Sequence, residues 1–433
     1  MSYFDFALLL EDQINTYILC LILSILIYIL IFRKKILSIF DPFTLCLLGS
    51  MMGFSVVIFL KATNTISNYY FYQYILSQVA FWLGFFIFNL KKVEISGLNN
   101  TPLITNNRYF YIYLLASGLF ILSNLAIYKV SGIPIFSEYR LGAVAVGGGF
   151  GLIRRFVNVL GPVCLYFSLY FLLGANKKLK YRLSTFIILL SYLIIAVLSG
   201  SKASIMIAIQ ISFLFCYLNR EHFGNLILKI KKQQFFILLI AGIMAVFVLV
   251  LQTSTDANES FIAILFRMIS YGDVFYMGYP DGVVEHLSKA NIFVVFFGDL
   301  FRTIRIFPPE LAPPGIGFEL YSLVSGVDAI GGPNPRHNVY GYVNFGFIGS
   351  LFFSFFCGFI INRVRSFVLS SNKNMSQDRK VLVLLLYFCF AYIEADPPAS
   401  ISAFDNLILL FPILLFFNAI LMRIEKPKLR GLS

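Results

Sequence analysis

The residues best suited to chemistry lie directly before an aromatic segment that is dotted with glycine. The run "RHNVYGYVNFGFIGS" begins with Arg336, His337 and Asn338. An imidazole of ordinary pKa, about 6.5, is mostly neutral at pH 7 and can accept a proton. Its two neighbours carry groups that could hold a substrate. A lone histidine is more often a plain surface or core residue, so the interest of His337 comes from these neighbours.

Further cations lie close to apolar segments. They are Arg140, Lys202, Arg267, Arg302 and Arg305. Taken singly, each is better explained as a side chain that reaches the membrane interface or pairs with an acid. Arg302 and Arg305 are three residues apart, however, and therefore share one helical face. Because guanidinium groups bind phosphate oxygens in pairs, the set as a whole suits an anionic headgroup attached to a lipid.

The elements that must position these residues are membrane helices. Of the 433 residues, 59% are hydrophobic, 17% aromatic and 13% charged, which is too apolar for a soluble domain of this length. We expect an all-α polytopic membrane protein with one integral domain over 1–433. Eleven apolar runs are predicted to span the membrane, at roughly 17–32, 43–60, 71–90, 109–128, 156–174, 183–199, 203–219, 235–252, 341–361, 381–395 and 405–422.

The distribution of Lys and Arg predicts the orientation. With the N-terminus outside and the C-terminus in the cytoplasm, most basic residues fall on the cytoplasmic side, as the positive-inside rule requires. This bias explains the net charge of +13 without a nucleic-acid partner. The first residues are acidic and carry no Lys or Arg, so we expect no cleaved signal peptide.

The same topology places one long loop, 253–340, on the outer side. Within it, 261–279 and 287–307 show helical patterns too polar or too interrupted to span, so we expect amphipathic helices on the outer face. The Pro- and Gly-rich stretch that follows predicts turns and irregular backbone, which can line a cavity.

Metal and disulfide chemistry find little support. The six cysteines fall inside apolar spans without paired spacing and are expected to be small core residues. Glu394 and Asp396 form an acidic pair that could bind a divalent ion, but a polar turn between two spans explains them better. We therefore predict no metal and no cofactor. Either acid could instead orient a histidine or bind sugar hydroxyls.

The chain resembles the O-antigen polymerase (Wzy-type) family, the oligosaccharide repeat-unit polymerases of bacterial envelopes. The residues that carry the resemblance are "LSGSKAS" at 198–204, "RHNVYGYVNFGFIGS" at 336–350, and Arg140 followed after ten residues by Gly151. The second external loop departs from the Arg-x10-Gly pattern, because Arg305 meets Gly315 after nine residues and Gly317 after eleven.

This resemblance implies a GT-C-like architecture in the bacterial inner membrane, with the long loop in the periplasm. It implies transfer of a growing glycan from undecaprenyl diphosphate to an incoming lipid-linked repeat unit, with a chain-length regulator as a partner. His337 would then be the catalytic base and Arg336 and Asn338 would position sugar or base. Arg140, Lys202, Arg267, Arg302 and Arg305 would hold the diphosphates. A flippase of lipid-linked oligosaccharide and an O-antigen ligase stay open as alternatives.

Overall fold

The protein is built from helices. The computed structural model describes residues 1–433 except 89–100, 107, 138–150, 176–178, 235, 237–264, 267, 304, 307–312, 328–330, 372–373 and 431–433. In the described part, all regular structure is helical, and seven helices are long and apolar enough to cross a membrane. The chain therefore has the build of a polytopic membrane protein, as the composition predicts.

The helices of the first half follow the predicted spans. In chain order they are α1 (Tyr3–Asp12), α2 (Ile14–Phe32), α3 (Pro42–Ala62), α4 (Asn68–Phe86), α5 (Arg108–Ser131), the short η1 (Pro134–Phe136), α7 (Gly151–Leu173), α8 (Leu179–Leu198) and α9 (Lys202–Leu218). Apart from α1 and η1, each covers most of one predicted span, although α4 ends four residues before the predicted end at residue 90. The predicted span at 235–252 falls almost wholly outside the described residues.

The second half is more broken. Its elements are η2 (Ser270–Gly272), α12 (Asp273–Gly278), η3 (Pro280–His286), α13 (Ile292–Thr303), α14 (Ile316–Ser325), α15 (Arg336–Ser370), α16 (Gln377–Phe390) and α17 (Pro397–Arg430). The predicted spans at 341–361, 381–395 and 405–422 fall in α15, α16 and α17, although α16 ends five residues early.

The expected amphipathic helix at 261–279 needs correction. Its described part consists of short helical pieces, and the side chains of Val274, Phe275 and Tyr279 are completely or almost completely buried. Phe6 of α1 stacks on Tyr276 at 4.3 Å between ring centroids. Apolar content alone does not say whether a segment enters lipid or protein, and this one enters the helix bundle.

Two further expectations for the long loop have different outcomes. The helix expected at 287–307 is present as the shorter α13, with Val295 and Gly298 buried on one side. The stretch expected to be irregular contains α14, which ends with Gly326 in the left-handed conformation. The turn-forming residues around α14 conceal its helical pattern in the sequence.

α15 is a hairpin of two helical arms rather than one straight span. Gly346 has φ 71° and ψ −171°, a conformation open only to glycine, and it separates an arm at 336–345 from a longer arm at 347–370. His337 contacts Ser354 at 2.8 Å, although a continuous helix would hold residues this far apart at about 25 Å. The rings of Tyr340 and Phe353 also pack together at 5.6 Å. The arm at 336–345 therefore folds back against its own helix.

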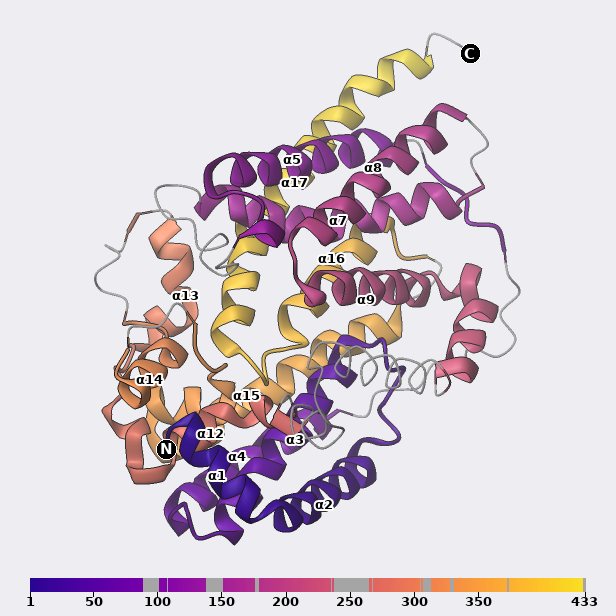
Figure 1. The fold of residues 1–433 in the computed structure, drawn as a ribbon. Coiled ribbons are helices and arrows are strands. Elements are labelled where there is room, and N and C mark those ends of the chain that lie inside the picture. Colours follow the sequence, from indigo (N-terminus) through magenta and orange to yellow (C-terminus); the bar gives the residue numbers. More distant parts are fainter. Residues whose placement is uncertain are drawn as a thin grey trace.

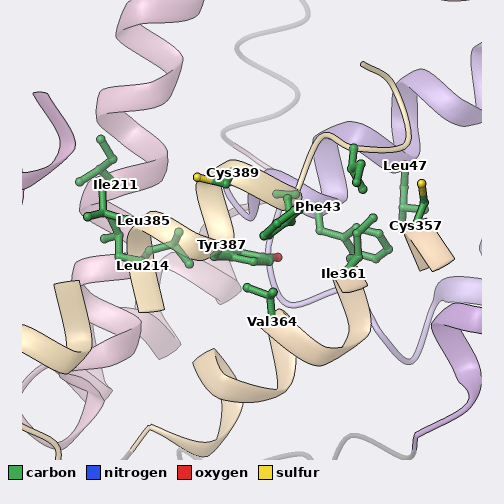
Figure 2. Packing of buried hydrophobic residues seen from close by; sticks show 14 of the residues in the cluster. Phe43, Leu47, Ile211, Leu214, Cys357, Ile361, Val364, Leu385, Tyr387 and Cys389 are labelled. Atoms are coloured by element: carbon green, nitrogen blue, oxygen red, sulfur yellow. The ribbon is translucent and has the colours of Figure 1, made fainter. Parts of the chain in front are cut away.

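The helices form two groups that α16 and α17 connect. α2, α3, α4, α12 and α15 contact one another, whereas α5, α7, α8 and α9 form the second group (Figure 1). Figure 2 shows how α16 joins them, because Leu385 faces Ile211 and Leu214 of α9 while Tyr387 faces Phe43 of α3. The six cysteines are buried and unpaired, in agreement with their expected role as small core residues.

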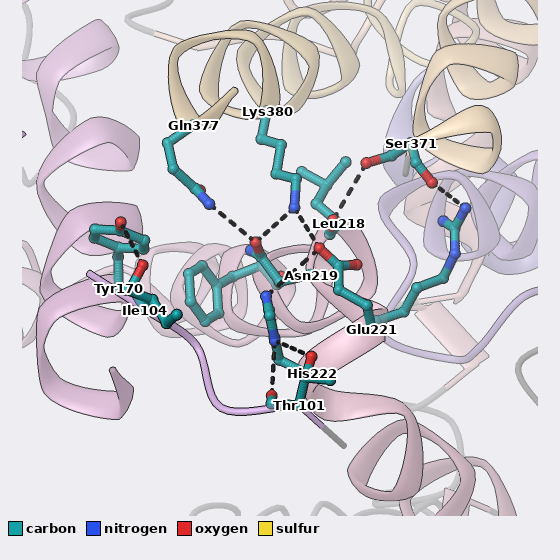
Figure 3. Close-up of polar contacts among 12 residues, drawn as sticks. Thr101, Ile104, Tyr170, Leu218, Asn219, Glu221, His222, Ser371, Gln377 and Lys380 are labelled. Carbon is teal, nitrogen blue, oxygen red and sulfur yellow. Dashed lines mark hydrogen bonds and ion pairs between the residues drawn. The ribbon is translucent and has the colours of Figure 1, made fainter. Parts of the chain in front are cut away.

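Segments predicted to lie on the cytoplasmic side meet at one end of the bundle. Lys380 of α16 donates to Glu221 at 2.8 Å and to Asn219 at 2.9 Å, and His222 contacts Thr101 (Figure 3). Segments predicted to lie outside meet elsewhere, as Tyr3 does with the ring of Phe266 at 5.2 Å. These contacts therefore join segments that are predicted to lie on the same side.

Candidate functional site

A cavity of about 400 Å³ lies between α13, the first arm of α15 and the start of α17. All of its wall segments belong to the long loop or adjoin it in space. The residues that line it are Ser288, Ala290, Val294, Val295, Gly298, Asp299, Arg302, Pro313, Pro314, Gly315, Ile316, Tyr340, Asn344, Pro398, Ala399, Ile401, Ser402 and Asp405. We call this space the outer cavity, because the predicted topology places it on the outer side.

Charged side chains gather where α13 crosses α17. Asp299 lies 3.5 Å from Arg302 and 3.6 Å from Arg155, and it accepts a hydrogen bond from the Ser402 hydroxyl. Asp405 accepts a hydrogen bond of 3.1 Å from the backbone N–H of Leu300. These contacts fix α13 against α17 and bring two carboxylates and one guanidinium to the cavity wall.

The other walls offer groups that suit a sugar. Tyr340 presents an aromatic ring, and Asn344 accepts from the N–H of Ala290 at 2.9 Å and donates to the carbonyl of Tyr340 at 2.9 Å. The prolines and aliphatic side chains supply apolar surface. A cavity with few, fixed polar groups among apolar ones is typical of small-molecule sites.

At the start of the first α15 arm, Arg336 is buried, and each nitrogen of its guanidinium group donates a hydrogen bond. Its Nε donates to the carbonyl of Tyr271, one terminal nitrogen donates to Glu394 and the other donates to the carbonyl of Gly49, each at 2.7 Å. The second carboxylate oxygen of Glu394 accepts from the Cys46 thiol at 3.3 Å. The ion pair thus holds the base of the first α15 arm to α3 and to the turn between α16 and α17.

His337 lies beside this pair and has no exposed surface. Its Nδ1 contacts the Ser354 hydroxyl at 2.8 Å, its ring stacks on Phe81, and its Nε2 is 3.9 Å from Glu394. Nε2 has no hydrogen-bond partner among the described residues. The imidazole does not line the outer cavity, so its predicted role as a base would require the arm to move.

Asn338 is also fully buried. Its side-chain nitrogen donates to the Ser77 hydroxyl of α4 at 2.8 Å, and its backbone carbonyl accepts from Gln73 at 3.2 Å. Like Arg336, it holds the first arm of α15 in place. The motif at 336–338 therefore forms a buried anchor. Tyr340 and Asn344, which lie one and two helical turns after Arg336, line the cavity instead.

The predicted cations are scattered. Arg302 lines the outer cavity, with a side chain that is 43% exposed. Arg305 is exposed in the turn after α13 and does not line the cavity. Lys202 begins α9, but its side chain falls outside the description, as do Arg140 and Arg267 altogether. Their predicted contact with diphosphate stays a prediction.

Sequence reasoning missed Asp299, Asp405, Tyr340 and Asn344. Asp299 shares a helical face with Arg302, three residues on, and this spacing was an available signal. Asp405 lies inside the apolar run 405–422, where an acid is costly and therefore informative. The pairing of α13 with α17 has no signal in a single sequence.

The acidic pair considered for a metal does not converge. Glu394 faces inward to Arg336, whereas the Asp396 carboxylate accepts from the N–H of Ala399 at 3.1 Å. In the described ranges, no three His, Cys, Asp or Glu side chains come together as metal ligands.

Comparisons with known proteins add no assignment. No protein-family model, no curated protein and no solved structure matches this chain.

Proposed function

We propose that the protein is a lipid-linked oligosaccharide polymerase that acts at the outer cavity. The observation that carries this proposal is the cavity itself, which combines Arg302, two carboxylates and a tyrosine ring within an apolar helical protein. Guanidinium suits the diphosphate of a lipid carrier, and carboxylates and aromatic rings suit sugars. The proposal includes eleven spans in a GT-C-like arrangement, a bacterial inner membrane, a periplasmic N-terminus and a cytoplasmic C-terminus.

The reaction needs little beyond positioning and charge stabilisation. A hydroxyl of the incoming lipid-linked repeat unit gives its proton to a base and attacks the anomeric carbon of the growing glycan, and the bond from that carbon to the undecaprenyl diphosphate breaks. The diphosphate leaves with the bonding electron pair, and a cation such as Arg302 stabilises its charge. Energy comes from the lipid diphosphate, so no nucleotide sugar is required.

A flippase for the same lipid-linked glycan is the second candidate. The buried Arg336–Glu394 ion pair favours it, because charged groups deep among membrane helices often belong to transport pathways. An O-antigen ligase would use the same chemistry with a different acceptor. The cavity lies beside the long loop that is predicted to be external, and this supports an enzyme over a flippase.

Deletion of the gene, followed by electrophoresis of the envelope polysaccharide, separates these functions. A polymerase predicts loss of the ladder with a single repeat unit retained. Loss of every repeat unit would instead indicate a ligase or a flippase, and an unchanged ladder would contradict all three. Complementation with the intact gene controls for effects on neighbouring genes.

A further inference from the structure

Asp405 is a buried carboxylate at the wall of the outer cavity. Its residue is 1% exposed, and it lies in the first turns of α17. One carboxylate oxygen accepts from the Leu300 N–H, and no second hydrogen-bond partner occurs among the described residues. A buried carboxylate needs partners for both oxygens. The remaining oxygen is therefore suited to accept a hydrogen bond from a hydroxyl of a bound molecule, or its proton.

The neighbouring carboxylate is less suited to take a proton. Asp299 is bonded to the Ser402 hydroxyl and lies within 3.6 Å of two guanidinium groups, Arg155 and Arg302. Both of its carboxylate oxygens are therefore already occupied by protein groups. Asp299 instead links Arg302 to the part of α17 that contains Asp405. It pairs with Arg302 and accepts a hydrogen bond from Ser402, which lies one helical turn before Asp405.

His337 is also less suited in this conformation. The imidazole has no exposed surface and lies in the buried anchor of the α15 arm. A general base must come within hydrogen-bond reach of the proton that it removes. Of these three groups, only Asp405 combines a place at the cavity with an oxygen that lacks a partner.

We propose that Asp405 is the proton acceptor of the transfer reaction, an inference that rests on the proposed polymerase function. The acceptor hydroxyl gives its proton to the free oxygen of Asp405 while its oxygen forms the new bond to the anomeric carbon. The bond from that carbon to the diphosphate breaks, and the electron pair leaves with the diphosphate. The proton then passes from Asp405 to solvent through the open side of the cavity, which restores the carboxylate.

The test uses the full chain, purified in detergent, with a lipid-linked repeat unit as substrate. Asp405→Asn keeps the hydrogen bond from Leu300 but cannot accept a proton. We expect turnover to fall by about 10²- to 10⁴-fold, while KM and the thermal unfolding temperature stay close to those of the wild type. Asp405→Glu should recover part of the activity together with the acidic limb of the pH–rate profile.

Asp281→Asn is the matched control, because Asp281 is exposed and does not line the cavity. Turnover by Asp405→Asn within threefold of the wild type would overturn the inference and leave the polymerase proposal intact. Equal loss in Asp405→Asn and Asp405→Glu, with lower unfolding temperatures, would also overturn it in favour of a structural role. Absence of polymer with the wild-type protein would instead reject the proposed function itself.

Discussion

Arg302 and Arg305 are equivalent in the sequence but not in the structure. Arg302 lies in the last turn of α13 and lines the outer cavity, whereas Arg305 follows the helix with φ 58°. The N–H of Ile306 bonds to the carbonyl of Phe301 and that of Arg305 to Arg302, which is the pattern of a helix stop. Arg305 therefore occupies a position that glycine would fill more easily, and it is exposed without lining the cavity.

Replacement of Arg302 by Ala should weaken binding of a lipid diphosphate. Loss of one charge-assisted contact costs about 1.5–3 kcal/mol, which corresponds to roughly a 10- to 100-fold increase in the dissociation constant. Titration of a short polyprenyl diphosphate into purified protein measures this change. Lys289→Ala is the control, because Lys289 is exposed beside the cavity without lining it. Equal weakening in both variants would show a general charge effect.

Asp273 should make the stability depend on pH. Burial raises its pKa to about 7, although the N–H of Val274 and the charge of Arg336 act in the opposite direction. The folded state therefore keeps a proton that the unfolded chain releases near pH 3.8, so stability should fall as the pH rises from about 4 to 7. Thermal unfolding across this range should show a weaker decline for Asp273→Asn, but an unchanged decline for Asp281→Asn. Parallel curves for wild type and Asp273→Asn would contradict this assignment.

At the scale of elements, the hairpin in α15 determines what the cavity contains. Arg336, His337 and Asn338 anchor its base. Tyr340 and Asn344 of the same first arm line the cavity wall. The chain reverses direction at Gly346. The residues at 336–338, which the sequence predicts for the site, therefore serve to position Tyr340 and Asn344. A catalytic and an anchoring motif look alike in one sequence, because both place polar groups beside apolar ones.

Gly346→Ala should disrupt this hairpin. A side chain in this glycine-only conformation costs on the order of 1–3 kcal/mol, so the unfolding temperature should fall and activity with it. Gly118→Ala in α5 is the matched control, since a Cβ there would meet no atom within 4 Å and alanine favours a helix. A similar unfolding temperature for Gly346→Ala and wild type would show that the turn is not under this constraint.

The sequence predicts most long helices and little of the site. Spans such as 43–60 and 109–128 match α3 and α5 because a long apolar run has few alternatives to a membrane helix. The segment at 273–279 is buried among helices instead of lying on the surface, and the turn at Gly346 divides what reads as one span. These features depend on contacts between distant segments, which hydropathy does not encode.

In the whole molecule, the polar contacts between loops and the outer cavity involve different segments. The polar contacts of Figure 3 join loops that are predicted to be cytoplasmic, and the outer cavity lies among segments predicted to be external. The proposed transfer would take place on the outer side, where substrate would arrive already attached to lipid.

Cysteine labelling tests the orientation directly. All six native cysteines are buried, so single cysteines introduced at the exposed positions Asp281 and Arg363 should give distinct signals. A membrane-impermeant maleimide should label Asp281→Cys in intact cells, and Arg363→Cys only after permeabilisation. The reverse pattern would place the cavity in the cytoplasm and exclude the proposed reaction.

An assay of the purified wild-type protein with a lipid-linked repeat unit and no nucleotide sugar tests the proposed polymerase activity directly. A polymerase should produce a ladder of longer glycans on the lipid, with one lipid diphosphate released for each unit added. Unchanged single repeat units in detergent, together with movement of the same lipid across the bilayer of proteoliposomes, would contradict it and identify a flippase.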